Sequence, residues 1–137
     1  MDFIIANDSK AIEDNLRLRY EIFCTEMSEN IDDVFDYLDQ ISYLFNIYED
    51  DKIIATSRVK IENGIGIISF LGVFKDARGM GVGSFLVNSI FQYLEKYANI
   101  YDFLLLTKKE TLPFFQKNGF IIDESANNIT LIQMKTK

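Results

Sequence analysis

The sequence predicts an α/β fold in which helices flank one mixed β-sheet. Apolar and polar residues alternate over 43–48 and 53–61, which is typical of half-buried strands. Residues 65–74 are apolar at nearly every position, as in a central strand that is covered on both faces. Over 82–97 the apolar residues recur every three or four positions instead, which predicts a long amphipathic helix.

The N-terminal elements follow from short local signals. Residues 3–6 are a predicted strand, and Asn7, Asp8 and Ser9 are each able to cap the helix that follows. Helical spacing of apolar residues continues to about residue 27.

Turn residues separate the central strands. Residues 49–52 form a predicted turn between the two alternating strands, and Asn63-Gly64 is a strong hairpin signal before the apolar strand. A glycine inside that strand, Gly72, indicates either a β-bulge or a close backbone approach.

The C-terminal third alternates between strand and helix. Residues 103–106 are a predicted buried strand, and 111–117 a short helix whose first turn tolerates Pro113. Gly119 is placed to end that helix. Two strands then complete the sheet, at 120–122 and 129–134.

Length and composition exclude several classes of protein. The 137 residues suit a single domain spanning 1–137, and the 12 Phe and 7 Tyr are enough to fill its core. There is no His, so a His general base, a Ser-His-Asp triad and His metal ligands are excluded, and we expect no metal. The single Cys24 excludes an internal disulfide and is expected to be a small buried residue.

The net charge of −7 argues against a nucleic-acid partner, which needs a basic face. No apolar run is long enough to span a membrane, and the N-terminus lacks the pattern of a signal peptide. We therefore expect a cytoplasmic protein that does not bind membranes.

Charge is distributed unevenly along the chain. Residues 20–51 contain ten acidic residues and no Lys or Arg, whereas residues 52–137 carry eleven basic and seven acidic residues. The stretch 28–40 has a loop-like pattern, although Asp32, Asp36 and Asp39 would share one face if it were helical. The acidic third is either a solvated surface or one wall of a site for a cation.

Three glycines between the apolar strand and the long helix form the most informative segment. Gly79, Gly81 and Gly83 allow a ligand to approach the backbone closely, and a helix N-terminus adds unpaired N–H donors. With Arg78 and Lys75 beside it, this turn predicts a cradle for a pyrophosphate. It matches neither a P-loop nor a dinucleotide-binding GxGxxG turn. The alternative is a glycine-rich turn that binds nothing.

Two longer motifs extend this interpretation. Arg78-x-x-Gly81-x-Gly83, following the strand end 71–73, resembles the acyl-CoA motif of the GNAT superfamily of N-acyltransferases. Residues 114–120, Phe-Phe-Gln-Lys-Asn-Gly-Phe, resemble a second GNAT segment. A third, weaker similarity covers 19–26 and the aspartates after it, as in one GNAT branch and in acyl-homoserine lactone synthases. The resemblance extends over nearly the whole chain.

The resemblance implies a particular fold and cofactor site. A GNAT-like sheet is mostly antiparallel, has about six or seven strands, and contains a central parallel pair that splays apart, here 65–74 and 103–107. Acetyl-CoA as co-substrate would lie along the first of these strands and in the glycine turn. The implied cofactor-binding residues are Leu71, Gly72, Val73, Arg78, Gly79, Met80, Gly81, Val82, Gly83, Ser84 and Phe115.

The implied activity is N-acetyl transfer from acetyl-CoA to a primary amine by direct attack, with a backbone N–H, that of Val73 for instance, polarising the thioester. Glu26 is the residue we predict as general base; Ser69 through a water, Glu62, Asp36 and Asp39 are alternatives. Many GNAT enzymes have a Tyr at the position of Phe115, and a Phe cannot protonate the leaving thiolate.

Other functions stay open at this point. The chain could bind acyl-CoA with little turnover, or transfer a longer acyl chain as the lactone synthases do. An interaction domain that binds no ligand is a further alternative. An acidic rim would favour a cationic small-molecule amine as acceptor. The C-terminal strands could pair across a homodimer or be covered within one chain.

Overall fold

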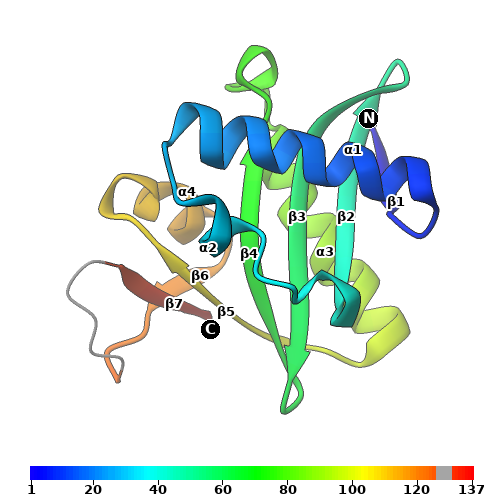
Figure 1. The fold of residues 1–137 in the computed structure, drawn as a ribbon. Coiled ribbons are helices and arrows are strands. Elements are labelled where there is room, and N and C mark those ends of the chain that lie inside the picture. The colour runs from blue at the N-terminus through cyan, green and yellow to red at the C-terminus, as the bar shows by residue number, and fades with distance from the viewer. Residues whose placement is uncertain (126–130) are drawn as a thin grey trace.

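The strands form one mixed sheet, as predicted. We describe residues 1–125 and 131–137 of a computed structural model of the chain. These residues form a seven-stranded sheet in the order β1-β2-β3-β4-β5-β7-β6 (Figure 1). Only β4 and β5 are parallel neighbours within this part of the chain. The strands are β1 (Asp2–Ile5), β2 (Ser42–Glu49), β3 (Lys52–Glu62), β4 (Ile65–Val73), β5 (Asp102–Thr107), β6 (Phe120–Ile122) and β7 (Ile132–Thr136).

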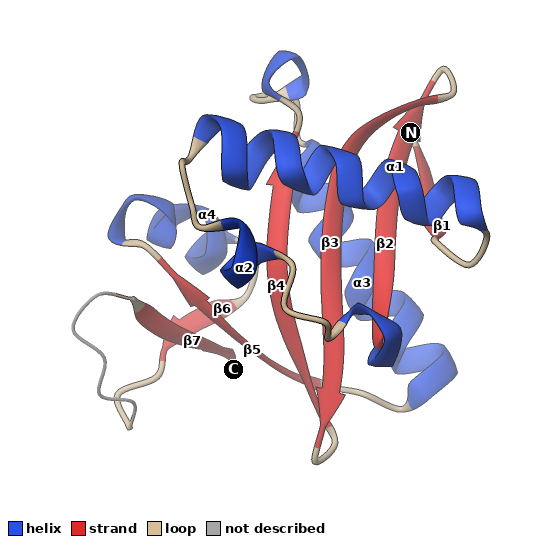
Figure 2. Cartoon of the chain, viewed as in Figure 1, coloured by secondary structure: helices blue, strands red, loops and turns tan. Residues whose placement is uncertain are grey.

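Helices cover both faces of the sheet (Figure 2). On one face α1 (Ser9–Arg19) crosses β2, β3 and β4 and continues as a π-helical segment, Tyr20–Glu26. On the other face lies the predicted long helix, α3 (Val82–Ala98). The remaining helices are α2 (Ile31–Val34), α4 (Leu112–Lys117) and three 3₁₀ turns, Asp39–Ile41, Lys75–Ala77 and Lys109–Thr111.

Local signals explain where these elements begin and end. Asp8 caps α1, because its side chain accepts a hydrogen bond of 2.8 Å from the N–H of Ala11. Asn63 and Gly64 both have positive φ, as the predicted hairpin turn between β3 and β4 requires. Residues 28–40 form no continuous helix, so Asp32, Asp36 and Asp39 do not share a helical face.

The hydrophobic core lies between the sheet and α3. Phe45 and Ile47 of β2 are completely buried there against Leu86, Ile90 and Leu94 of α3. Burial of such side chains stabilises the fold by roughly 1.5–3 kcal/mol each.

The face of the sheet under α1 is polar by contrast. Asn15 is fully buried, and its side-chain NH₂ donates to the Asn46 side chain at 2.8 Å and to the Phe45 carbonyl at 3.2 Å. Asp14, Arg19, Thr56 and Arg58 are also at least nine-tenths buried. Hydrogen bonds therefore help to hold α1 on the sheet, beside a small apolar cluster of Ala6, Ala11 and Leu44, whereas apolar packing holds α3.

The parallel strands β4 and β5 pair over only part of their length. Residues 65–68 pair with 102–105, after which β5 pairs with β7 and the strands separate. At this point β4 has a bulge, because Phe70 and Leu71 both lie opposite Ser57 of β3. Gly72 follows directly, so the bulge predicted from this glycine is confirmed. A Cβ at Gly72 would lie 2.9 Å from the Cδ1 atom of Ile22, so a side chain approaches it closely rather than a backbone.

The C-terminal strands differ from the prediction in their roles. β7 lies inside the sheet between β5 and β6, whereas β6 is the edge strand and its Ile121 and Ile122 are partly exposed. The predicted strand 129–134 begins partly outside the described residues, since 126–130 are not described. Pairing of β6 across a homodimer stays a prediction.

Cys24 is partly buried in the π-helical segment. Burial, and secondly the charge of Glu29, raise the pKa of its thiol, which keeps it protonated at neutral pH. In the described part of the chain, no helix combines the length and the apolar character that a membrane crossing requires.

We expect stability to depend on pH through Asp14 and Tyr48, which face each other under α1. The hydroxyl of Tyr48 donates to Asp14 at 2.7 Å; burial and this bond raise the pKa of Tyr48 to about 12. Burial alone would raise the pKa of Asp14, but hydrogen bonds from Tyr48 and Lys10 and the charges of Lys10 and Arg17 keep it below the ordinary value.

The Tyr48 contribution is therefore complete below about pH 10, the unfolded value, and is lost as the pH rises towards 12. The Asp14 contribution is present above about pH 4 and is lost as the pH falls through the lowered pKa. Urea denaturation from pH 3 to 11.5 measures both losses. Tyr48→Phe should show a shallower alkaline loss than the wild type; equal slopes would contradict this assignment.

Candidate active site

The glycine turn between β4 and α3 leaves open space above its backbone. Gly79 and Gly81 have φ of +80° and +79°, and a Cβ built on either would have no heavy atom within 4 Å. Glycine is favoured there because other residues adopt this conformation with strain. Gly83 is different: its Cβ would lie 3.0 Å from the ring of Phe114, so this glycine lets α4 approach α3 closely.

The same turn presents unpaired hydrogen-bond donors. The first bond within α3 is from the N–H of Phe85 to the carbonyl of Gly81, at 3.0 Å. None of the N–H groups of residues 79–84 donates to an acceptor in the described part of the chain. These donors and the positive end of the α3 dipole fit an anionic group such as a pyrophosphate.

Arg78 joins this turn to the π-helical segment. Its Nε donates to the Val73 carbonyl at 2.9 Å, and its Nη2 donates to Glu26 Oε2 at 2.9 Å and Oε1 at 3.0 Å. The structure thus brings together the predicted cofactor ligand Arg78 and the predicted base Glu26, although 52 residues separate them. Their side chains are 47 % and 28 % exposed, so this ion pair contributes at most about 1 kcal/mol.

The end of β4 faces the gap that its separation from β5 creates. The N–H of Phe74 donates to the Ile54 carbonyl of β3 at 2.8 Å. Because hydrogen-bonding direction alternates along a strand, the N–H of Val73 points away from β3, towards the gap. It therefore has the orientation that polarising a group bound there would require.

Phe115 lies in the core rather than in the glycine turn. It is 8 % exposed, and its ring packs edge-on against Phe114 at 5.0 Å and Phe120 at 5.7 Å. The neighbouring Phe114 is the ring that contacts the start of α3. A contact between Phe115 and a cofactor stays a prediction, and the packing gives a sufficient reason for a Phe there.

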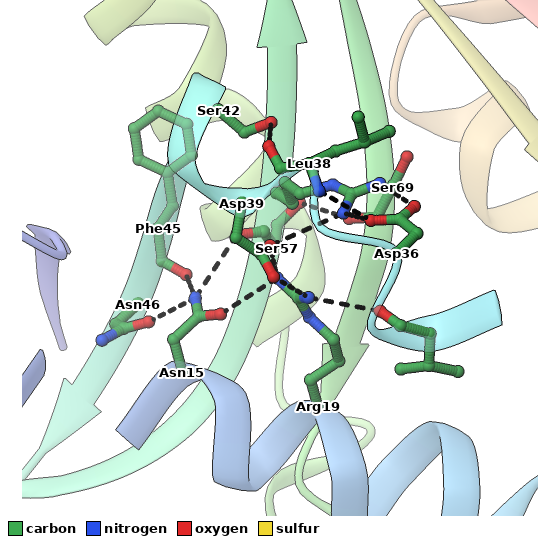
Figure 3. Close-up of polar contacts among 12 residues, drawn as sticks. Asn15, Arg19, Asp36, Leu38, Asp39, Ser42, Phe45, Asn46, Ser57 and Ser69 are labelled. Atoms are coloured by element: carbon green, nitrogen blue, oxygen red, sulfur yellow. Dashed lines mark hydrogen bonds and ion pairs between the residues drawn. The ribbon is translucent and has the colours of Figure 1, made fainter. Parts of the chain in front are cut away.

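Two buried arginines form ion pairs with the aspartates that were predicted as alternative bases (Figure 3). Arg19 of α1 donates to both oxygens of Asp39, at 2.8 and 3.1 Å, and Arg58 of β3 donates to both oxygens of Asp36, at 2.6 and 3.0 Å. The hydrogen bond from Arg58 is the largest cause that lowers the pKa of Asp36. Both carboxylates are therefore structural partners of arginines, and the lowered pKa of Asp36 makes that carboxylate a poor proton acceptor.

The other candidate bases lie at different places on β3 and β4. Glu62 pairs with Ile65 beside the hairpin. Ile65 is eight residues before Val73, so roughly 25 Å of extended strand separates Glu62 from the end of β4. Ser69 lies next to the bulge, where the strands separate. Sequence analysis missed Arg58 and Phe70 as residues of this region, because neither belongs to a motif.

Comparisons with known proteins show the family of the chain and its fold. Residues 10–120 match the Acetyltransferase (GNAT) family. The chain is 26 % identical over 123 residues to the uncharacterized N-acetyltransferase YjcF of Bacillus subtilis (strain 168), covering 88 % of this chain and 85 % of that protein.

Two solved structures share the fold. An acyl-CoA N-acyltransferase from Pseudomonas aeruginosa superposes with a TM-score of 0.86 at 19 % identity, over 100 % of both chains. The PaiA N-acetyltransferase of Thermoplasma acidophilum, solved in complex with coenzyme A, gives 0.76 at 14 % identity and covers 100 % of this chain and 99 % of that chain.

The match to the family extends from α1 to the start of β6. It includes the π-helical segment that carries Glu26, the glycine turn, and the helix α4 that packs on that turn. The chain therefore belongs to the GNAT family of acetyltransferases.

Proposed function

We propose that this protein transfers an acetyl group from acetyl-CoA to a primary amine. The observation that carries the proposal is the set of unpaired N–H donors over 79–84. These donors follow the end of β4, beside the gap between β4 and β5. A pyrophosphate on these donors would allow the rest of the cofactor to run along 71–73 into that gap. The coenzyme A complex of the structurally similar PaiA enzyme supports this choice of cofactor.

The chemistry assigned to this chain is mainly positioning. The amine nitrogen attacks the thioester carbonyl, so that a C–N bond forms, the C–S bond breaks and CoA leaves as its thiolate. The N–H of Val73 polarises the carbonyl, and Glu26 accepts the proton that the amine loses. To do so, Glu26 must share or leave the guanidinium of Arg78 that both its oxygens contact.

The acceptor in this proposal is a cationic amine. Ion pairs with Arg58 and Arg19 compensate the charges of Asp36 and Asp39, but several acids of the same third of the chain remain exposed or partly exposed. Among these are Glu21, Asp32 and Asp33. Their charge favours the approach of a positively charged amine, and added salt weakens that effect.

A second candidate function is the binding of acyl-CoA with little turnover. The Phe at position 115 favours it, because a Phe has no hydroxyl with which to protonate the leaving thiolate. A thiolate leaves readily without an acid (free thiol pKa about 8.5), so we rank acetyl transfer first.

Calorimetric titration with acetyl-CoA and with CoA tests the cofactor site. We expect binding to the wild type and at least a tenfold weaker affinity for Gly81→Glu, whose carboxylate repels a pyrophosphate in the turn. Gly64→Glu is a matched control: Gly64 has a φ of +77° and equally open surroundings, but it lies in the β3–β4 hairpin. Both variants bear the same strain and charge, so only the position differs.

The outcomes separate the candidate functions. Binding that Gly81→Glu weakens and Gly64→Glu does not would support the cofactor site, and thiol release with a panel of neutral and cationic amines would then test transfer. Binding without release would favour the second candidate. A folded wild type that binds neither ligand would contradict both.

A further inference from the structure

Phe70 adopts a backbone conformation that is unusual for its type. It stands in the bulge of β4 with a φ of +53°, in the left-handed region that bulky residues rarely enter. Such a conformation persists only where the surrounding structure stabilises it. The contacts of the Phe70 side chain therefore decide whether the bulge keeps its shape.

Two buried guanidinium groups lie over the ring of Phe70. The Cζ atoms of Arg19 and Arg58 lie 4.9 and 4.8 Å from the ring centroid, and Phe23 packs edge-on against it at 5.5 Å. Both arginines are at most 4 % exposed, and their attraction to an aromatic face is strongest when water is excluded.

The arginines are themselves held in place. Asp39 and Asp36 each accept two hydrogen bonds from one guanidinium, whereas the Nε atoms of Arg19 and Arg58 are buried with no hydrogen-bond partner in the described structure. The ion pairs thus fix the outer edges of both guanidiniums. The guanidinium of Arg19 also lies over the ring of Phe35, at 5.5 Å, and Arg58 pairs with Ser69 of β4 through the backbone. The ring of Phe70 is the side chain of β4 over which both guanidiniums lie.

This contact lies where the two parallel strands separate. Ile68 is the last residue of β4 that pairs with β5, and Phe70 follows two positions later. After the bulge, the end of β4 at 71–73 pairs with β3 and no longer with β5. Those are the residues along which the proposed function places the acyl group.

We propose that Phe70 is a positioning residue for acyl transfer: held by its contacts with Arg19 and Arg58, it maintains the bulge that opens the gap beside 71–73. This inference rests on the proposed function. In this role Phe70 does not contact the substrate; it acts through the shape of the bulge. It also links the acidic loop that carries Asp36 and Asp39 to the geometry of the acyl site.

The test compares Phe70→Leu and Arg58→Lys with the control Phe91→Leu. Phe91 is also a partly buried Phe, but it belongs to α3, where it packs on Phe103 at 4.8 Å. Arg58→Lys keeps the charge opposite Asp36 and removes the flat face over the ring. Amide hydrogen exchange is measured over 69–74 without ligand, and kcat and the Kd for CoA are measured with the amine that the panel identifies.

We expect faster exchange over 69–74 in Phe70→Leu and Arg58→Lys, but not in Phe91→Leu. We also expect kcat to fall at least tenfold in the first two while the Kd for CoA stays within about threefold of the wild type, because the glycine turn is unchanged. Unaltered exchange at 69–74, or a kcat equal to that of Phe91→Leu, would overturn the inference. Absence of CoA binding by the wild type would contradict the proposed function instead. The exchange measurement would still test whether the contacts of Phe70 with Arg19 and Arg58 maintain the bulge.

Discussion

Asp39→Asn is expected to lower the free energy of unfolding by about 3–5 kcal/mol. Asp39 accepts hydrogen bonds of 2.8 and 3.1 Å from Arg19, whose side chain is 1 % exposed. The substitution preserves the size of the side chain but leaves a buried guanidinium without a compensating charge, which is costly in a medium that excludes water. Urea denaturation at pH 7 measures the loss.

A control and a double variant make this result specific. Asp33→Asn removes an exposed acid from the same segment and should change stability by about 0.5 kcal/mol or less. Arg19→Met combined with Asp39→Asn should be more stable than Asp39→Asn alone, because it removes the unpaired charge as well. A loss below 1 kcal/mol for Asp39→Asn, or no recovery in the double variant, would show that the pair does not stabilise the fold as described.

The second large effect concerns catalysis by Glu26. We expect Glu26→Gln to lower kcat for acetyl transfer by about 10²–10⁴-fold, the usual contribution of a general base. The amide oxygen can still accept a hydrogen bond from Arg78, which lies 2.9 Å from the native carboxylate, so the Kd for CoA should change only a few-fold. Thiol release from acetyl-CoA gives kcat, and calorimetry gives the Kd.

Glu29→Gln is the matched control, since Glu29 is a partly buried acid three residues further along the chain with no ion pair in the described structure. Its kcat should equal that of the wild type. If Glu26→Gln and Glu29→Gln have the same kcat, Glu26 is not the base, and its contact with Arg78 is only a means of holding that arginine. If Glu26→Gln loses CoA binding along with kcat, Glu26 acts by positioning Arg78.

Most elements could be predicted because their signals are local. The 3.6-residue period of α3, the Asn63-Gly64 turn and the cap Asp8 each depend on residues close in sequence. The glycine turn could be predicted for the same reason, since its unpaired donors come from consecutive backbone groups. Even Gly72 gave a usable signal, although the residue that approaches it, Ile22, could not be foreseen.

The functions of individual aspartates and aromatic rings could not be predicted. Asp36 and Asp39 find their partners Arg58 and Arg19 at separations of 22 and 20 residues, so sequence spacing offers no sign of the pairs. Phe114 and Phe115 are adjacent, and periodicity over a six-residue helix does not decide which ring faces the core and which meets Gly83. Gly72 indicated a bulge in β4, but the contacts that Phe70 makes there with three other segments have no sequence signature.

The sequence by itself therefore determined the class of fold, the order of its main elements, and the backbone of the anion-binding turn, because backbone conformation responds to propensities and periods that neighbouring residues define. Only the tertiary structure decided that Glu26 contacts Arg78, that two arginines contact the ring of Phe70, and that β4 leaves β5 after Ile68. Each of these depends on side chains that meet across the fold. The free energy of such contacts comes from burial and from charges placed opposite one another, and neither exists before the chain has folded.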